Sequence, residues 1–160
     1  MAQASRWPQL AACFARLGMP VAVVDLETTG GNMYEDRVTE VALLRFEGGK
    51  ITQHQWLVNP EQPISPFITR LTGIDNEMVA AAPTFAELAP TLLPLLRGTL
   101  VVAHNSRFDY TFLRHEFRRA GVCFAAPALC TVQLSRRLYP EFHKHNLDSI
   151  IERFDLAVES

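Results

Sequence analysis

The sequence predicts an α/β domain built on a mixed sheet. Two apolar segments, residues 21–25 and 100–103, show no alternation of polar and apolar side chains, so each is typical of a strand buried on both faces. Residues 38–58 contain two further strands joined by a short turn, and helical patterns lie on both sides of residues 100–103. Strands joined by a tight turn are antiparallel, whereas strands joined through a helix run parallel, and the combination gives a mixed sheet.

Composition is that of an ordinary globular domain. The chain has 160 residues, of which 48% are hydrophobic and 20% are charged, and its formal net charge is −2. No run of about 18 apolar residues is present, so the sequence predicts no membrane span. The three cysteines lack the spacing of a zinc site and favour reduced thiols in a cytoplasmic protein. The charge balance neither indicates nor excludes a nucleic-acid partner.

The N-terminal segment is expected to form an amphipathic leader helix over residues 8–17. Gly18 and Pro20 would end this helix. Arginines interrupt its apolar stretch, so it lacks the continuous hydrophobic core of a secretory signal. We therefore divide the chain into a leader helix at residues 1–19 and a main domain at residues 20–160. Such a helix would pack on the sheet or dock a partner.

A β-hairpin is predicted after the first buried strand. Residues 38–46 and 51–58 are strand-like, and Gly48-Gly49 between them favours a tight hairpin turn. Several prolines then interrupt the chain, and a short helix is expected over residues 67–71.

A longer helix is expected to begin at Thr84, because Thr84 and Glu87 have the spacing of a capping box. This helix should run to Leu96. Pro90 and Pro94 lie inside it, and they predict a bend or a break, since proline removes a helical hydrogen bond.

The C-terminal third is expected to combine helices with one short strand. Apolar residues spaced for one face predict a helix over residues 108–120. A short strand near residues 128–130 and a helix over residues 131–139 follow. Asn146 can cap a last helix. The inward positions of this helix would be Leu147, Ile150, Ile151 and Phe154.

Acidic side chains follow both buried strands, at the sheet edge where α/β proteins bind ligands. Asp25 and Glu27 lie two positions apart, so an extended strand places both on the same face. Neighbouring carboxylates repel each other unless a cation lies between them. Asp109, near the start of the helix after the second buried strand, would bring a third carboxylate to this edge. Such oxygen ligands suit Mg²⁺ or Mn²⁺.

Two segments carry a specific resemblance to a known family. VDLETTG, at residues 24–30, and VAHNSRFDYTFL, at residues 102–113, resemble the first two motifs of the DEDD 3′–5′ exonuclease superfamily. Within it, the chain is most similar to the DEDDh-type proofreading epsilon-subunit family of bacterial DNA polymerase III. The intervening LVNPEQPISPFITRLTGIDNEMVAAAPTF and the later HNLDSIIERF match that pattern as well, so the likeness covers about residues 20–154.

The resemblance implies a ribonuclease-H-like fold, a mixed five-stranded sheet flanked by helices, and a two-metal nuclease. With two Mg²⁺ or Mn²⁺ ions, Asp25 would bridge both and Glu27 would bind the ion that holds the attacking water. Asp109 would hold the second ion. The implied function is 3′–5′ exonuclease hydrolysis of phosphodiester bonds at DNA 3′ ends, in replication proofreading or repair. The residues flanking the terminal nucleotide would be Leu26, Thr28, Thr29 and Phe108.

The family's third motif is a histidine base followed five positions later by an aspartate. His143 and Asp148 have this spacing, but HNLDSIIERF corresponds to the helix that precedes the motif, so we interpret the pair as a coincidence. We therefore expect the main domain to be truncated before its third motif and this chain alone to be weakly active or inactive. A polymerase subunit or an additional C-terminal domain is an implied partner.

Two alternatives keep the fold and change the function. An oligoribonuclease-like enzyme would use the same chemistry on RNA, although the step from Glu27 to Gly30 is more similar to the DNA-acting branch. A non-catalytic module of this fold would bind nucleic acid or a polymerase. Such a module would not need to bind two metal ions, so Mn²⁺ binding distinguishes it from the enzymes.

Overall fold

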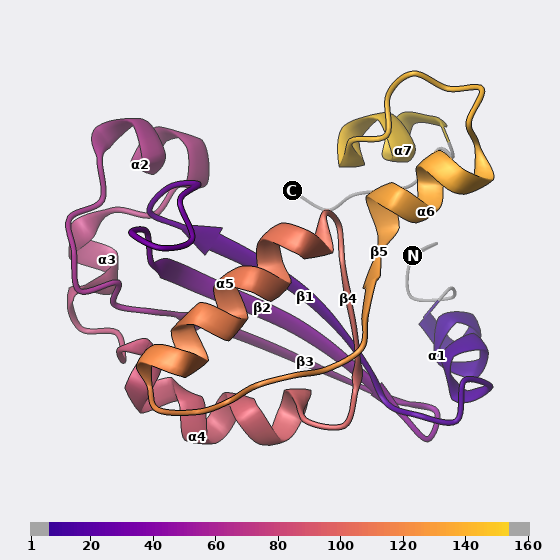
Figure 1. The fold of residues 1–160 in the computed structure, drawn as a ribbon, viewed down its shortest axis with the longest axis horizontal. Helices are drawn as coiled ribbons and strands as arrows, with labels where there is room; N and C mark the ends of the chain where they lie inside the picture. Colours follow the sequence, from indigo (N-terminus) through magenta and orange to yellow (C-terminus); the bar gives the residue numbers. More distant parts are fainter. Residues whose placement is uncertain (1–6, 154–160) are drawn as a thin grey trace.

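The computed structural model describes residues 7–153, which form a five-stranded mixed sheet with helices on both faces (Figure 1). The strand order is β3-β2-β1-β4-β5. The β1–β2 and β2–β3 pairs are antiparallel, whereas the β1–β4 and β4–β5 pairs are parallel, which confirms the predicted mixed sheet. The strands are β1 (Val21–Thr28), β2 (Val38–Glu47), β3 (Lys50–Leu57), β4 (Leu100–Ala103) and β5 (Ala128–Cys130).

Helices α4 and α5 cover one face of the sheet, and α1 covers part of the other. On the first face, Phe112 and Leu113 of α5 belong to the main apolar core together with Val24 of β1. On the second face, Ala11 of α1 packs against Val21 and neighbouring apolar residues, so the leader helix packs on the sheet. The helices are α1 (Trp7–Ala15), α2 (Pro66–Thr72), α3 (Asn76–Ala80), α4 (Phe85–Leu96), α5 (Ser106–Arg119), α6 (Thr131–Leu138) and α7 (Leu147–Arg153). Within the described chain, no helix has both the length and the hydrophobicity needed to span a membrane.

Strand β1 continues three residues beyond its predicted end, to Thr28. The apolar run ends before Asp25, so the sequence gives no sign of this extension. Pairing with β2 continues through Glu27 opposite Glu40, and an irregularity in the register follows between Glu27 and Thr28. The hydrogen-bonded partner strand therefore keeps β1 extended where the side chains become polar.

Helix α4 runs unbroken through Pro90 and Pro94, so the predicted break is absent. Both prolines are exposed, and water can hydrate the backbone carbonyls that they leave without a helical donor. Thr84 caps the helix as predicted, because its side chain accepts a hydrogen bond from Glu87 N at 3.2 Å. The buried face holds the helix on the sheet and consists of Phe85, Leu88, Ala89, Leu92 and Leu96.

For the last helix, α7, the predicted cap by Asn146 is confirmed, whereas the predicted burial of Leu147 is wrong. Asn146 Oδ1 accepts a hydrogen bond from Ser149 N at 3.2 Å, which confirms the cap. Leu147 was expected to face inward but is 52% exposed, because α7 lies beside α6 instead of on the sheet (Figure 1). Ile150 and Ile151 are half-buried, and Phe154 lies outside the described residues. The short helix α3, which was not predicted, is capped by Asp75.

Candidate active site

The site begins with alternating side chains at the end of β1. Val24 and Leu26 point into the core beneath α4 and α5, so the side chains between and beyond them face the other side of the sheet. Asp25 is exposed and Glu27 is half-buried on that second face. Because β1 remains extended through Thr28, the two carboxylates lie on the same face of the same strand.

Asp109 reaches this region through a gap in the sheet. Strand β4 pairs with β1 only over residues 21–23, so the edge of β1 beyond Val23 has no neighbouring strand on that side. Helix α5 begins beside this gap, and Asp109 in its first turn is only 5% exposed. Asp109 Oδ1 accepts a hydrogen bond from Leu26 N at 3.2 Å. A carboxylate from a helix on one face therefore lies beside a strand whose carboxylates project from the other face.

The pKa shifts show that the three carboxylates influence one another. Burial is the main cause that raises the pKa of Asp109 to about 7, and repulsion by Asp25 is the next. Burial also raises the pKa of Asp25, although the Leu26 N–H opposes this shift. Burial, followed by repulsion from Asp25 and from Glu40, raises the pKa of Glu27. The site therefore concentrates negative charge that a bound cation would relieve.

The donor set fits a hard divalent cation, since carboxylate oxygens are the ligands that Mg²⁺ and Mn²⁺ prefer. The arrangement is open, however. Within residues 7–153, no set of three or more His, Cys, Asp and Glu side chains is arranged so that it could hold a metal ion. Asp25, Glu27 and Asp109 are thus brought within electrostatic range of one another but not into a finished coordination shell.

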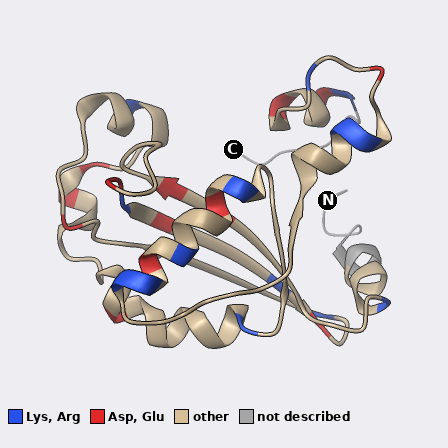
Figure 2. Ribbon diagram, viewed as in Figure 1, with Lys and Arg blue, Asp and Glu red and all other residues tan. Residues whose placement is uncertain are grey.

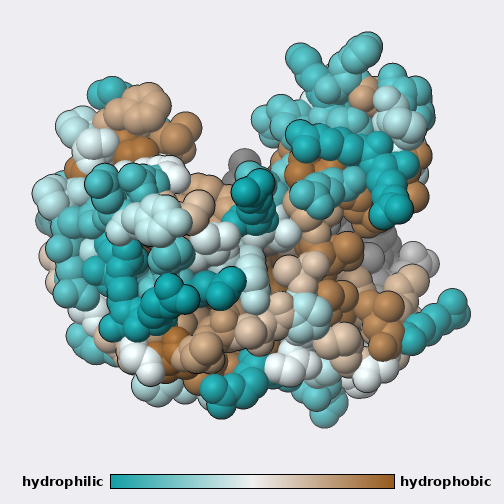
Figure 3. Space-filling model, viewed as in Figure 1, coloured by the Kyte–Doolittle hydropathy of each residue, from teal (hydrophilic) through white to brown (hydrophobic). Residues whose placement is uncertain are grey.

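The surroundings of the site form an open hollow. Figure 3 shows a depression between the part of the surface that carries α2 and the part that carries α6 and α7. The end of β1 and the start of α5 lie between these two parts (Figure 1). Acidic positions at the end of β1 and near the start of β2 lie in the same region, together with a basic position at the start of α5 (Figure 2). An extended chain could therefore reach the carboxylates without displacing an element of the fold.

The residues expected to flank a terminal nucleotide differ in what they present to the site. The Leu26 side chain is buried in the core, so only its backbone faces Asp109. Thr28 Oγ1 donates to Gly30 O at 2.6 Å, and Thr29 Oγ1 donates to Gln62 Oε1 at 2.7 Å. The two threonine hydroxyls therefore hold the loop after β1 in shape. Phe108 is half-buried against the main core.

His143 and Asp148 are exposed, and no hydrogen bond or ion pair in the described part of the chain joins either to the three carboxylates. The buried histidine of this region is His145. Its Nε2 lies 2.9 Å from Phe142 O and its Nδ1 lies 2.8 Å from Ser135 Oγ, so both ring nitrogens are used between α6 and α7.

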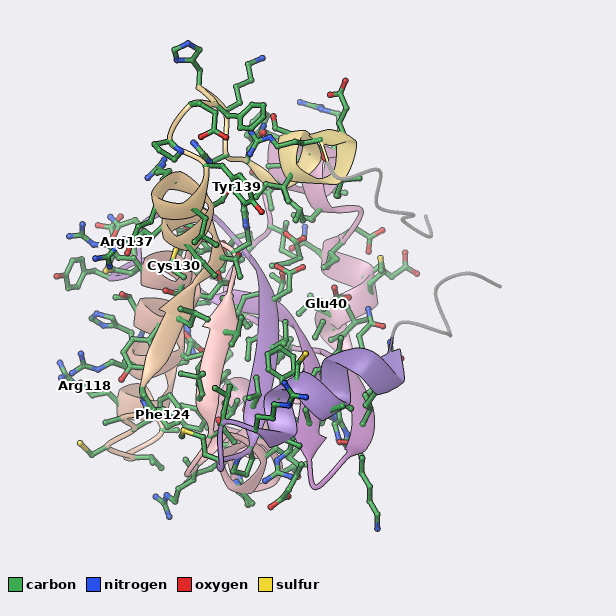
Figure 4. All side chains as sticks on the ribbon, turned by 90° about the vertical axis from the view of Figure 1, so that its right-hand side faces the viewer. Glu40, Arg118, Phe124, Cys130, Arg137 and Tyr139 are labelled. Carbon is green, nitrogen blue, oxygen red and sulfur yellow. The ribbon has the colours of Figure 1, made fainter. Side chains whose placement is uncertain are left out.

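Two residues near the site were not identified as functional from sequence. His104 follows β4 directly, its Nδ1 lies 2.8 Å from Thr131 Oγ1, and it interacts electrostatically with Asp25. Glu40, which is labelled in Figure 4, is paired with Glu27 in the register of β1 and β2 and accepts a hydrogen bond from Gln55 Nε2 at 3.1 Å. In the sequence, Glu40 stands out only as an acidic residue within the apolar strand VTEVALLRF. Which residue of β1 lies opposite it depends on the strand register.

Comparison with known proteins identifies the family. The model of the exonuclease family RNase_T matches residues 22–160. The chain is 38% identical over 137 residues to the PolC-type DNA polymerase III of Caldanaerobacter subterraneus subsp. tengcongensis, covering 85% of this chain and 10% of that protein. It is 37% identical over 139 residues to the 3′-5′ exonuclease DinG of Bacillus subtilis, covering 84% of this chain and 15% of that protein. The chain thus spans only a small part of the length of these relatives.

Solved structures share the fold. Exonuclease X in complex with 5′ overhanging duplex DNA superposes with a TM-score of 0.67 and 28% identity, covering 88% of this chain and 76% of that one. Product-bound exonuclease I gives a TM-score of 0.77 at 18% identity, covering 89% of this chain and 40% of that one. These likenesses confirm the ribonuclease-H-like fold that the motifs implied. Taken with the match across residues 22–160, they establish that the chain belongs to the exonuclease family.

Proposed function

We propose that this chain is the catalytic domain of a 3′–5′ exonuclease that hydrolyses phosphodiester bonds at DNA 3′ ends. The observation that supports the proposal is that Asp25, Glu27 and Asp109 lie within electrostatic range of one another near the gap between β1 and β4, with the pKa of all three raised. Membership of the exonuclease family and similarity to a PolC-type DNA polymerase III support a DNA substrate and a role in replication or repair.

Asp25, Glu27 and Asp109 would hold two Mg²⁺ or Mn²⁺ ions. When bound, such ions polarise the phosphate and lower the pKa of a water molecule. The Leu26 N–H keeps the Asp109 carboxylate against β1. The backbone of residues 26–29 and the Phe108 ring would flank the terminal nucleotide through stacking and backbone contacts, with little sequence preference.

Release of nucleotides from a labelled single-stranded DNA with a free 3′ end, in the presence of Mg²⁺ or Mn²⁺, tests the proposal. Asp25→Asn and Asp109→Asn should each lower the rate by about 10²–10³-fold, the usual loss when a group that stabilises transition-state charge is removed. Asp148→Asn is the matched control, because it removes the same charge from an exposed side chain that no hydrogen bond or ion pair within the described residues joins to the three carboxylates. A rate that survives Asp25→Asn would contradict the proposal.

The nucleotide-release assay also tests whether His143 acts as the general base. We propose that His143 is not the general base, so His143→Ala should leave the rate unchanged.

A DNA trinucleotide should be cut faster than the RNA trinucleotide of the same sequence, and the reverse order would favour an RNA exonuclease. Titration with Mn²⁺ separates both enzymes from a non-catalytic binding module, which need not bind two ions. A polymerase subunit as partner and a cytoplasmic location are part of the proposal.

A further inference from the structure

The most buried ionisable side chain in the described part of the chain lies outside the carboxylate site. Glu116 of α5 is 1% exposed. Arg37 grips its carboxylate with two hydrogen bonds, from Nε at 2.6 Å and from Nη2 at 3.3 Å. Arg119 Nη1 donates to the same carboxylate at 2.5 Å. A carboxylate so deeply buried is strongly unfavourable without charged partners, so the three side chains form one unit.

This ion-pair unit binds the loop that follows β1. The loop comprises residues 29–37, and Arg37 is its last residue. Arg37 N donates to Thr29 Oγ1 at 3.0 Å, while Thr29 N donates to Arg37 O at 2.8 Å, so the two ends of the loop are joined. Arg119 Nη2 donates to Tyr34 O at 2.8 Å, in the middle of the loop. Glu116 therefore holds the loop at two points, through two different arginines.

The same unit belongs to the helix that carries Asp109. Glu116 and Asp109 are seven positions apart on α5, which places them on the same face two turns from each other. The loop begins immediately after Thr28, at the end of the strand that carries Asp25 and Glu27. The unit therefore connects the two elements that form the candidate site.

Stability alone does not account for a unit of this kind. A buried ion pair is often no more stabilising than apolar side chains of similar volume, because the charges must be desolvated. Arginine–carboxylate pairs do provide directional, two-pronged hydrogen bonds that fix one geometry. Arg37 binds Glu116 in this two-pronged way, whereas Arg119 joins the Glu116 carboxylate to Tyr34 O through one hydrogen bond to each.

We propose that Glu116 is a positioning residue that, through Arg37 and Arg119, holds loop 29–37 against α5 and keeps Thr28 and Thr29 in place for the 3′-terminal nucleotide. This inference rests on the proposed function. It assigns the ion-pair unit to recognition of the free 3′ end, a role distinct from the metal binding proposed for Asp25, Glu27 and Asp109.

The test measures the preference of the chain for a free 3′ end. Fluorescence anisotropy, in buffer with EDTA, gives the dissociation constants for a linear single-stranded DNA and for the circular form of the same sequence. Arg119→Met removes one arginine of the unit but leaves the Arg37–Glu116 pair intact, so the domain should still fold. Glu116→Gln keeps the volume of the side chain and one acceptor oxygen, but it replaces the other acceptor oxygen by an NH2 donor and removes the charge. Both variants should reduce the linear-over-circular preference by about tenfold, which corresponds to one or two lost hydrogen bonds.

Arg118→Met is the matched control. Arg118 is the neighbouring residue on α5 and loses the same charge on substitution, but its side chain extends away from the sheet (Figure 4) and makes no hydrogen bond or ion pair within the described residues. The Arg118→Met variant should prefer linear over circular DNA as strongly as the unaltered chain does. Urea unfolding of each variant checks that the domain is folded, and a general loss of stability would weaken binding of linear and circular DNA equally.

Each possible result either supports or contradicts the positioning role of Glu116. A preference that falls in Arg119→Met and Glu116→Gln but not in Arg118→Met supports the positioning role. A preference that is unchanged in all three variants, or is lost equally in all three, overturns it while leaving the proposed function in place. If the unaltered chain shows no preference for the linear strand, the proposed recognition of 3′ ends is wrong and the positioning role is wrong with it.

Discussion

At Gly30 the backbone passes so close to Asp36 that a Cβ atom would lie 2.4 Å from Asp36 Oδ2. The Asp36 carboxylate cannot easily move away, because Oδ2 accepts a hydrogen bond from Asn32 N at 2.9 Å and Oδ1 lies 3.1 Å from Thr29 Oγ1. The φ angle of Gly30 is not in the left-handed region, so space alone requires glycine here. The motif glycine after Glu27 therefore shapes the loop beside the candidate site.

Gly30→Ala should lower the free energy of unfolding by about 1–3 kcal/mol, as overpacking against a fixed neighbour usually does. Gly31→Ala is the matched control, since a Cβ at Gly31 would meet no atom within 4 Å and its φ angle needs no glycine. The control should be within about 0.5 kcal/mol of the unaltered chain. Urea unfolding measures both values, and equal stabilities for the two variants would show that the loop yields to the added methyl group.

At the residue scale, the sequence predicted which carboxylates to examine but not how they meet. The spacing of Asp25 and Glu27 places both on one face once the strand is extended, and this follows from strand geometry alone. The contact between Asp109 and the Leu26 N–H could not be predicted, because it depends on where β4 ends relative to β1. The pairing of Glu40 with Glu27 also depends on register, which no local pattern determines.

At the scale of the element, helix α4 shows a local signal overruled by packing. Proline in a helix interior removes a hydrogen bond and crowds the preceding turn, so a break at Pro90 was a reasonable expectation. The apolar face of α4 lies on the sheet over its whole length, and both prolines lie on the opposite, exposed face. Burial of that face outweighs the lost hydrogen bonds, and the helix continues.

Pro90→Ala should therefore raise the free energy of unfolding by about 1–3 kcal/mol, since it restores the N–H that can donate to Ala86 O. Pro83→Ala serves as the control, because Pro83 precedes the Thr84 cap and lies outside the helix. That variant should change stability by no more than about 0.5 kcal/mol. Chemical denaturation provides the comparison, and a Pro90→Ala variant less stable than the unaltered chain would indicate that the ring itself packs favourably.

At the scale of the whole molecule, the buried carboxylate of Asp109 couples stability to pH. Its pKa is raised from 3.8 to about 7, so the folded chain retains a proton that the unfolded chain loses between these values. This contribution to stability is fully present below about pH 4 and is lost as pH rises through about 7. In EDTA, the free energy of unfolding should therefore decline from pH 5 to pH 8.

Asp109→Asn should remove most of this decline and stabilise the metal-free chain at pH 8 by up to about 4 kcal/mol, at about 1.4 kcal/mol per pKa unit. Asparagine keeps an oxygen that can accept from Leu26 N, so the fold should persist. Parallel profiles for Asp109→Asn and the unaltered chain would show that another group causes the dependence.

Mn²⁺ should reverse the decline, because a bound cation replaces the proton that Asp109 loses. At a concentration about 100 times the dissociation constant, a ligand that binds only the folded state adds about 2.7 kcal/mol. The gain should be larger at pH 8 than at pH 5, since protonated carboxylates are poor ligands. Thermal unfolding with and without Mn²⁺ measures this difference, and an equal gain in Asp25→Asn would place the ion elsewhere.

The sequence by itself determined the strands, most of the helices and the family, because apolar periodicity, capping residues and the two motifs are local patterns. Only the tertiary structure decided that β1 continues to Thr28, that α4 does not break, and that Leu147 is exposed. The burial of Glu116 between two arginines is likewise a tertiary feature, because nothing in the sequence of this amphipathic helix distinguishes Glu116 from an exposed acidic residue. These features depend on which distant segments pack together, and the free energy of such contacts exceeds the local preferences that a sequence displays.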